Sequence, residues 1–95
     1  MPHEGDGVAK DQEEAVKWLR KAAEQNDAAA QLDLGVCYTN GEGVAKDYVE
    51  AYKWRLLAAR HGEEQARKEM TLLENKMTPE QIAEGQKRAR DFKPR

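Results

Sequence analysis

"GEGVAKDYVEAYKW", which runs from Gly41 to Trp54, decides the fold because the chain carries nearly the same stretch earlier. The earlier copy, "GDGVAKDQEEAVKW", runs from Gly5 to Trp18, and ten of the fourteen aligned positions are identical. The two tryptophans are 36 residues apart. Self-similarity at a fixed period of this size is the sequence signature of a stacked structural unit. The alternative interpretation is a duplicated active-site loop.

Composition and length indicate one helical domain that covers residues 1–95. Strong helix formers such as Ala, Glu, Lys and Leu dominate, and no segment alternates between apolar and polar residues with period two. The net charge of −2 gives no overall field that would attract nucleic acid or an anionic membrane. A single cysteine, Cys37, excludes an internal disulfide framework.

Each copy leads into a predicted helix, the first over 11–25 and the second over 47–61. An aspartate, Asp11 or Asp47, precedes each segment, and a glutamate follows three residues later, as in a capping box. Alanine and tryptophan then recur three residues apart on one helix face, which predicts packing between helices. We therefore expect both tryptophans to be buried between helices.

Three further helices are predicted over 27–39, 63–76 and 78–92, which makes five in all. The helix over 27–39 has Leu34 on its apolar stripe and Gly35 beside it. A glycine inside a helix costs about 1 kcal/mol relative to alanine. Its presence there predicts that another helix backbone approaches closely.

The stretch "AAEQNDAAAQLDLGVCYTNGEGVAKDYVEAYKW" resembles the Sel-1-like repeat (SLR), a relative of the tetratricopeptide repeat (TPR). That family has a 36-residue unit with the pattern A-A-E-Q-G, A-x-x-x-L-G-x-x-Y, G-x-G-V, D, A and W. Asn26 departs from it, because the family usually has glycine there. The resemblance implies an all-α, right-handed α-α superhelix, a TPR-like solenoid of five antiparallel helices. Neighbouring helix pairs in such an array share one core.

The repeat pattern divides the chain and assigns structural positions. The expected units are a half repeat over 5–26, a full repeat over 27–62, a degenerate half repeat over 63–76 and a closing helix over 78–92. The expected structural positions of the motif are Gly5, Gly7, Trp18, Leu34, Gly35, Tyr38, Gly41, Gly43, Val44, Ala51 and Trp54. The glycines of both copies are expected to form turns between paired helices, since glycine adopts a positive φ at little cost.

No constellation of residues predicts catalysis, a cofactor or a metal. A phosphate-binding loop needs Gly-Lys-Ser/Thr, which neither glycine-rich copy has. A nucleophilic Cys37 would need a base, and the two histidines, His3 and His61, show no catalytic or metal-ligand spacing. The prediction is therefore no enzyme, no cofactor and no metal. An enzyme that uses Cys37 ranks third among the interpretations.

The resemblance implies an interaction scaffold or adaptor that binds a protein or peptide segment in a concave groove. The first helix of each pair lines that groove in TPR-like solenoids, and the face opposite Leu34 is the one that would be exposed there. The expected groove residues are Ala29, Leu32, Asp33, Val36, Asn40, Gln65, Lys68, Glu69 and Leu72.

The ends of the chain leave a second function open. The first unit lacks its first helix, so the helix that carries Trp18 would have one bare flank. The alternative to a scaffold is therefore a self-associating module, a homo-oligomer built through the incomplete N-terminal repeat. No signal peptide or membrane span is predicted, which favours the cytoplasm. A periplasmic or secreted location stays open if the chain is a piece of a longer array.

Overall fold

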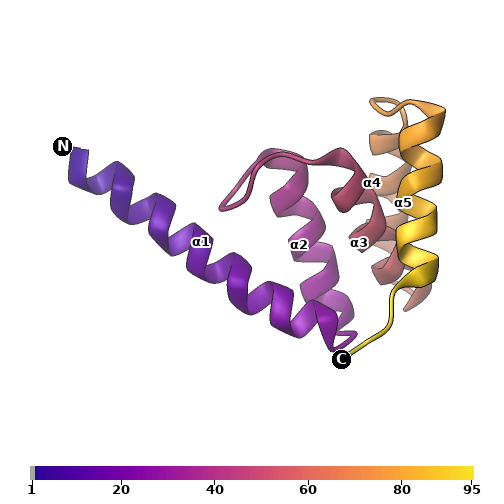
Figure 1. Ribbon diagram of the computed structural model, residues 1–95, viewed down its shortest axis with the longest axis horizontal. Helices are drawn as coiled ribbons and strands as arrows, with labels where there is room; N and C mark the ends of the chain where they lie inside the picture. The colour runs from indigo at the N-terminus through magenta and orange to yellow at the C-terminus, as the bar shows by residue number, and fades with distance from the viewer. Residues whose placement is uncertain (1) are drawn as a thin grey trace.

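The computed structural model describes residues 2–95, with side-chain surroundings from residue 10 onward, and it contains five helices and no strand over that range (Figure 1). The helices are α1 (Pro2–Glu24), α2 (Ala28–Asn40), α3 (Tyr48–Arg60), α4 (Glu64–Glu74) and α5 (Pro79–Asp91). The prediction of an all-α helical repeat is confirmed. The four later helices begin and end close to the expected positions.

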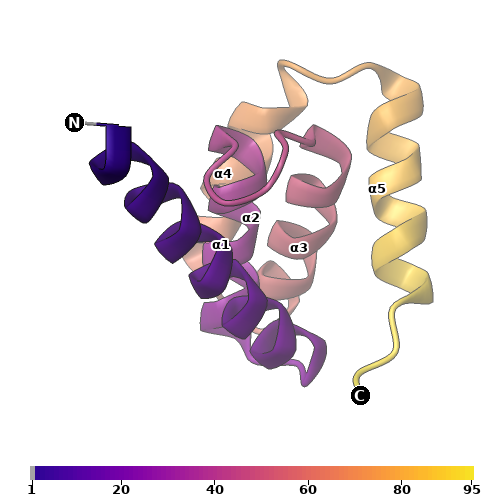
Figure 2. The same ribbon diagram turned by 60° about the vertical axis from the view of Figure 1, so that its left-hand side comes forward.

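Helix α3 is the centre of the packing. It contacts α2, α4 and α5, and Figure 2 shows it between α2 and α5. Tyr52 joins three of these helices, since its ring lies against Gly85 of α5 and its hydroxyl donates a 2.7 Å hydrogen bond to Glu74 of α4. Burial and the bond to Glu74 raise the pKa of Tyr52 to about 12, so its hydroxyl stays protonated as a donor at neutral pH.

Side-chain caps start three of the later helices. Asp27 accepts a hydrogen bond from the backbone N–H of Ala30, at 3.0 Å, and Asp47 accepts one from Glu50, at 3.1 Å. Thr78 forms a complete capping box at the start of α5. These caps pair backbone donors that the first turn leaves without helical partners, and each typically contributes about 1 kcal/mol. The expected starts at Asp47 and Thr78 are confirmed.

The turn between α2 and α3 is built by its glycines and docks on α1. Gly41 ends α2 with a φ of 71°, and its N–H donates to the Cys37 carbonyl. Gly43 has a φ of 73°, and a Cβ there would lie 2.4 Å from the carbonyl oxygen of Gln12. The second glycine therefore permits both the left-handed turn and the close approach to the α1 backbone. The expectation of a turn at these two glycines is confirmed.

The first glycine-rich copy behaves differently, and the turn predicted at Gly5 and Gly7 is wrong. Both residues lie within α1, which continues past Asp11 without the predicted helix start. In the later copy the turn is held by α2, where the Asp47 N–H donates to the Tyr38 carbonyl. In the first copy the continuous helix α1 supplies the backbone acceptors instead. A continuous helix then satisfies the backbone groups.

The two repeated tryptophans also have different surroundings. Trp54 is 2% exposed and meets the Phe92 ring edge to face, with ring centroids 5.4 Å apart. Trp18 is 66% exposed, so the prediction that it packs between helices is wrong. Helix α5 lies along α3 and covers Trp54, whereas α1 packs mainly on α2 and diverges from the other helices toward its N-terminal end (Figure 1).

Replacing each tryptophan by alanine should therefore give unequal losses of stability. Trp54→Ala should lower the free energy of unfolding by about 3–5 kcal/mol, since it leaves a cavity beside Phe92. Trp18→Ala should change it by less than about 0.5 kcal/mol. Urea denaturation followed by far-UV circular dichroism measures both. Equal losses would contradict the exposure of Trp18 and show that it packs as closely as Trp54.

Two glycines with similar φ provide a test of turn docking. Gly43→Ala combines a positive φ with a clash against α1, whereas Gly62→Ala has a φ of 89° and nothing within 4 Å of the new Cβ. Gly62→Ala should cost about 1–2 kcal/mol from backbone conformation alone. Gly43→Ala should cost clearly more, and thermal denaturation of the two variants compares them. A Gly43→Ala variant as stable as Gly62→Ala would contradict the docking of this turn on Gln12.

Candidate protein-binding groove

A cavity of about 290 Å³ opens between α2 and α4, with α3 beneath it. Its walls come from the C-terminal half of α2 and the C-terminal half of α4. The lining residues are Val36, Thr39 and Asn40 of α2, Arg55 of α3, Glu69, Leu72 and Leu73 of α4, and Lys76 of the turn that follows α4. We call this set the α2–α4 groove.

The groove is closed at one end by small apolar residues. Ala58 and Ala59 of α3 form a buried cluster with Ala66 of α4, and Leu32 and Met70 pack against it. Alanine side chains allow helix backbones to approach closely, so α3 and α4 lie close together at this cluster. The cavity lies toward the C-terminal ends of α2 and α4.

The groove floor carries a buried ion pair. The Arg55 Nε lies 3.4 Å from the Glu69 Oε2, and the two side chains are 7% and 21% exposed. Burial lowers the pKa of Arg55, and the Glu69 charge acts in the opposite direction. Arginine nevertheless stays protonated at neutral pH. The other Glu69 oxygen accepts a 3.2 Å hydrogen bond from Gln65, which fixes the carboxylate beside the guanidinium.

Gly35 makes room for this arginine. A Cβ at Gly35 would lie 2.8 Å from the Arg55 Cγ and 3.3 Å from the Ala51 carbonyl oxygen. The predicted close approach of a neighbouring helix backbone at Gly35 is therefore confirmed. In the first copy of the repeat, Leu19 is at the position equivalent to Arg55, so the motif has an apolar side chain there.

The structure brings four of the nine expected groove residues to the cavity. These are Val36, Asn40, Glu69 and Leu72, of which Leu72 is 65% exposed. The other five do not line it: Ala29, Asp33, Gln65 and Lys68 are exposed elsewhere on α2 and α4, and Leu32 packs at the closed end.

Four lining residues lie outside the nine expected ones: Thr39, Arg55, Leu73 and Lys76. Arg55 had a detectable signal, because it is a charged residue where the otherwise similar first copy has Leu19. Thr39 and Leu73 carry no comparable signal, since their positions depend on how far apart α2 and α4 lie.

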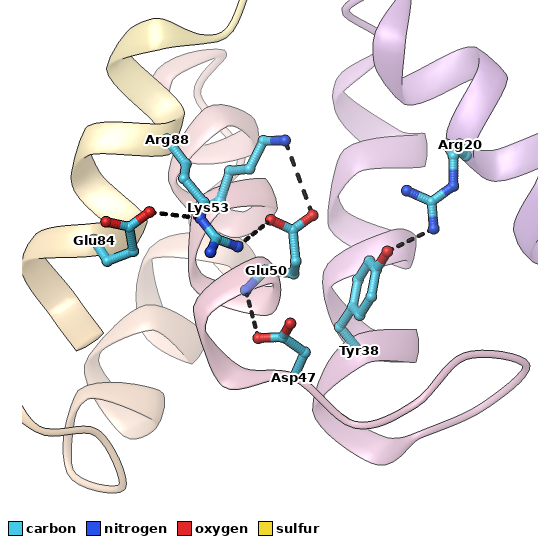
Figure 3. Close-up of polar contacts among 7 residues, drawn as sticks. All are labelled: Arg20, Tyr38, Asp47, Glu50, Lys53, Glu84 and Arg88. Carbon is cyan, nitrogen blue, oxygen red and sulfur yellow. Dashed lines mark hydrogen bonds and ion pairs between the residues drawn. The ribbon is translucent and has the colours of Figure 1, made fainter.

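A second polar cluster ties α5 to α3, and Figure 3 shows it in close-up. The Arg88 guanidinium donates to Glu50 of α3 at 2.8 Å and to Glu84 of its own helix at 2.9 Å. These two hydrogen bonds raise the pKa of Arg88, and the bond to Arg88 lowers the pKa of Glu84. Glu50 also lies 3.9 Å from the ammonium of Lys53, whose pKa burial lowers.

Helix α1 is tied to α2 by a separate polar contact in the same view. Arg20 donates a hydrogen bond to the Tyr38 hydroxyl, and its guanidinium carbon lies 5.6 Å from the centroid of that ring (Figure 3). Each cluster contains one contact between helices, Arg88 with Glu50 and Arg20 with Tyr38. These clusters therefore stabilise the helix arrangement, whereas the groove holds an open volume.

Cys37 is half-buried on α2. Burial raises the pKa of its thiol, and the nearby Glu42 and Asp33 charges add to the effect. The thiolate is the nucleophilic form, so these surroundings suppress its reactivity. Over residues 10–95 no group of three potential metal ligands forms. No helix in the described part of the chain combines the length and apolar character needed to cross a membrane.

The stacked helix pairs and the groove between their first helices define an α-helical repeat protein of the superhelical class. The chain belongs to the Sel1 repeat family, whose model, described as Sel1 repeat, matches residues 1–27 and 28–63. The suspected Sel-1-like repeat is thus confirmed. No curated protein matches the chain at a significant level.

One solved structure with the same fold is similar over nearly the whole chain. It is the crystal structure of c5321, described as a protective antigen present in uropathogenic Escherichia coli strains displaying an SLR fold. The sequences are 36% identical, and the TM-score is 0.82 over 94% of this chain. This chain spans 19% of the length of that protein.

The buried pair predicts coupled effects on stability. Glu69→Leu should lower the free energy of unfolding by about 3 kcal/mol, because it leaves the Arg55 charge buried without its partner. The double variant Arg55→Leu/Glu69→Leu should return to within about 1 kcal/mol of the wild type, since apolar residues often replace such a pair without loss. Urea denaturation of the four proteins measures the coupling. Additive losses would contradict it.

Proposed function

We propose that this chain is a protein-interaction module that binds a protein segment in the α2–α4 groove. Sel1 repeats and an SLR fold suggest a protein-interaction repeat scaffold. The observation that carries the proposal is the open cavity with Leu72 exposed at its wall and Val36 half-buried opposite. Leu72 and Trp18 are the exposed large hydrophobic residues among those described, and Leu72 is the one beside a cavity.

The size of the cavity favours one anchoring side chain of a partner segment. A volume of about 290 Å³ lies at the lower end of the range for small-molecule pockets. Protein segments that bind grooves commonly insert a few anchor side chains and leave the rest of their surface at the rim. Val36 and Leu72 supply the apolar contacts, and Asn40 supplies amide groups at the rim.

The polar groups of the groove support binding and not catalysis. The Thr39 hydroxyl donates a 2.8 Å hydrogen bond to the Gly35 carbonyl, so its proton is engaged within α2. Glu69 is engaged by Arg55 and Gln65. Neither arrangement contains the nucleophile and adjacent base that covalent catalysis requires.

Selection of displayed random peptides on the immobilised chain tests this function. Selected peptides should bind the wild type, and Val36→Asp/Leu72→Asp should weaken their binding at least about tenfold, because two carboxylates replace apolar contacts on opposite walls. Fluorescence polarisation with synthetic copies of the peptides measures the affinity.

The control places the same charges on the same helices away from the cavity. Ala29→Asp/Thr71→Asp changes one exposed residue of α2 and one of α4 that do not line the groove. Its affinity should stay within about twofold of the wild type. Equal loss in the two double variants, or no peptide that depends on Val36 and Leu72, contradicts the proposal. Light scattering on the same samples tests self-association, the other function that the sequence leaves open.

A further inference from the structure

The guanidinium of Arg55 has more hydrogen-bond donors than the protein satisfies. Its side chain is more than nine-tenths buried, yet it lines the α2–α4 groove. The Nε lies 3.4 Å from Glu69, but neither that nitrogen nor the Glu69 Oε2 has a hydrogen-bond partner in the described part of the structure. A guanidinium carries five N–H donors, and each buried polar group without a partner costs free energy.

The position of Glu69 determines which edge of Arg55 is free for a ligand. Glu69 contacts the Nε side and is held there by Gln65. The edge formed by the two terminal nitrogens carries four N–H donors, and Arg55 lines the open cavity. This edge is the one that binds a carboxylate through two parallel hydrogen bonds.

The charges of the groove point to an anionic ligand. Arg55 and Lys76 are cationic and Glu69 is anionic, so the lining carries a net positive charge in a chain whose total is −2. The Glu69 charge offsets one of the two cationic charges, and a ligand carboxylate would offset the other. A dianionic phosphate group would meet stronger repulsion from Glu69, which favours a carboxylate.

The two repeats differ at the position of this arginine. Leu19 occupies the equivalent position in the first copy, and the helix that contains it still packs on α2. The repeat pattern by itself therefore does not specify an arginine at position 55. Gly35, which leaves space for the Arg55 side chain, allows the charge to reach the cavity.

We propose that the α2–α4 groove binds an acidic protein segment, with an Asp or Glu side-chain carboxylate of that segment on the terminal nitrogens of Arg55. An apolar side chain next to that acid contacts Val36 and Leu72, and Lys76 lies at the rim near the same charge. The proposal rests on the proposed function, because it names the chemistry of the segment that the groove binds.

The test uses peptides selected on the wild-type chain and shown to depend on Val36 and Leu72. They are synthesised with acetylated and amidated ends, so that side chains are the only source of carboxylates. Each Asp or Glu is replaced in turn by Asn or Gln, and fluorescence polarisation measures the affinity. One replacement should weaken binding to the wild type at least about tenfold, since a charge-assisted pair is lost.

The same replacement is then measured against Arg55→Leu, which places at position 55 the residue that the first repeat has at Leu19. If Arg55 binds that carboxylate, the replacement should change the affinity of this variant by less than about twofold. If Arg55→Leu does not fold, Arg55→Lys serves in its place. Lys76→Ala, at an exposed residue of the groove, is a further variant. Arg55→Lys should lose much of the preference for the acid, because lysine lacks the two-pronged geometry.

Two results overturn the inference while leaving the proposed function intact. One is that the peptides depend on Val36 and Leu72 but no acid-to-amide replacement weakens them. The other is that a replacement weakens binding to the wild type, Arg55→Leu and Arg55→Lys equally, which would place the acid elsewhere. Absence of any peptide that depends on Val36 and Leu72 overturns both proposals.

Discussion

Burial of α3 on several sides is the constraint that the other helices satisfy. Seven of its thirteen residues are buried, including a tyrosine, a tryptophan and an arginine. Tyr52 and Trp54 are covered by α5, while Ala51 allows α2 to approach closely. A helix that is buried on this scale cannot be stable alone, so its neighbours must be present for the free energy of burial to be gained.

The same constraint explains why the first and last helices differ. Helix α5 covers the α3 face that contains Trp54, and it is attached by the Phe92 ring and by the ion pair between Arg88 and Glu50. Helix α1 supplies Val16 and Ala23 to the core but leaves Trp18 in water. Identical motifs therefore end in different environments, because the environment depends on which helices lie beside each copy.

The groove forms because α2 and α4 both pack on α3. A buried alanine cluster joins α3 to α4, and the cavity lies toward the C-terminal ends of α2 and α4 with Arg55 beneath it. A buried arginine with a partly satisfied guanidinium costs free energy in the absence of a ligand. That cost is the physical reason to associate this position with binding, since Leu19 shows that the repeat tolerates an apolar residue there.

The sequence by itself determined the four later helices, the repeat and the helix faces that carry Val36 and Leu72, because these depend on period, caps and helix angle. The angle from Leu34 placed Val36 on the face of α2 that lines the cavity, and the same angle in the next repeat placed Leu72 on its other wall. Only the tertiary structure decided that Trp18 is exposed and that Arg55 forms the floor of the cavity. Both outcomes depend on the distances between helices far apart in sequence, and a repeat pattern contains no information on those distances.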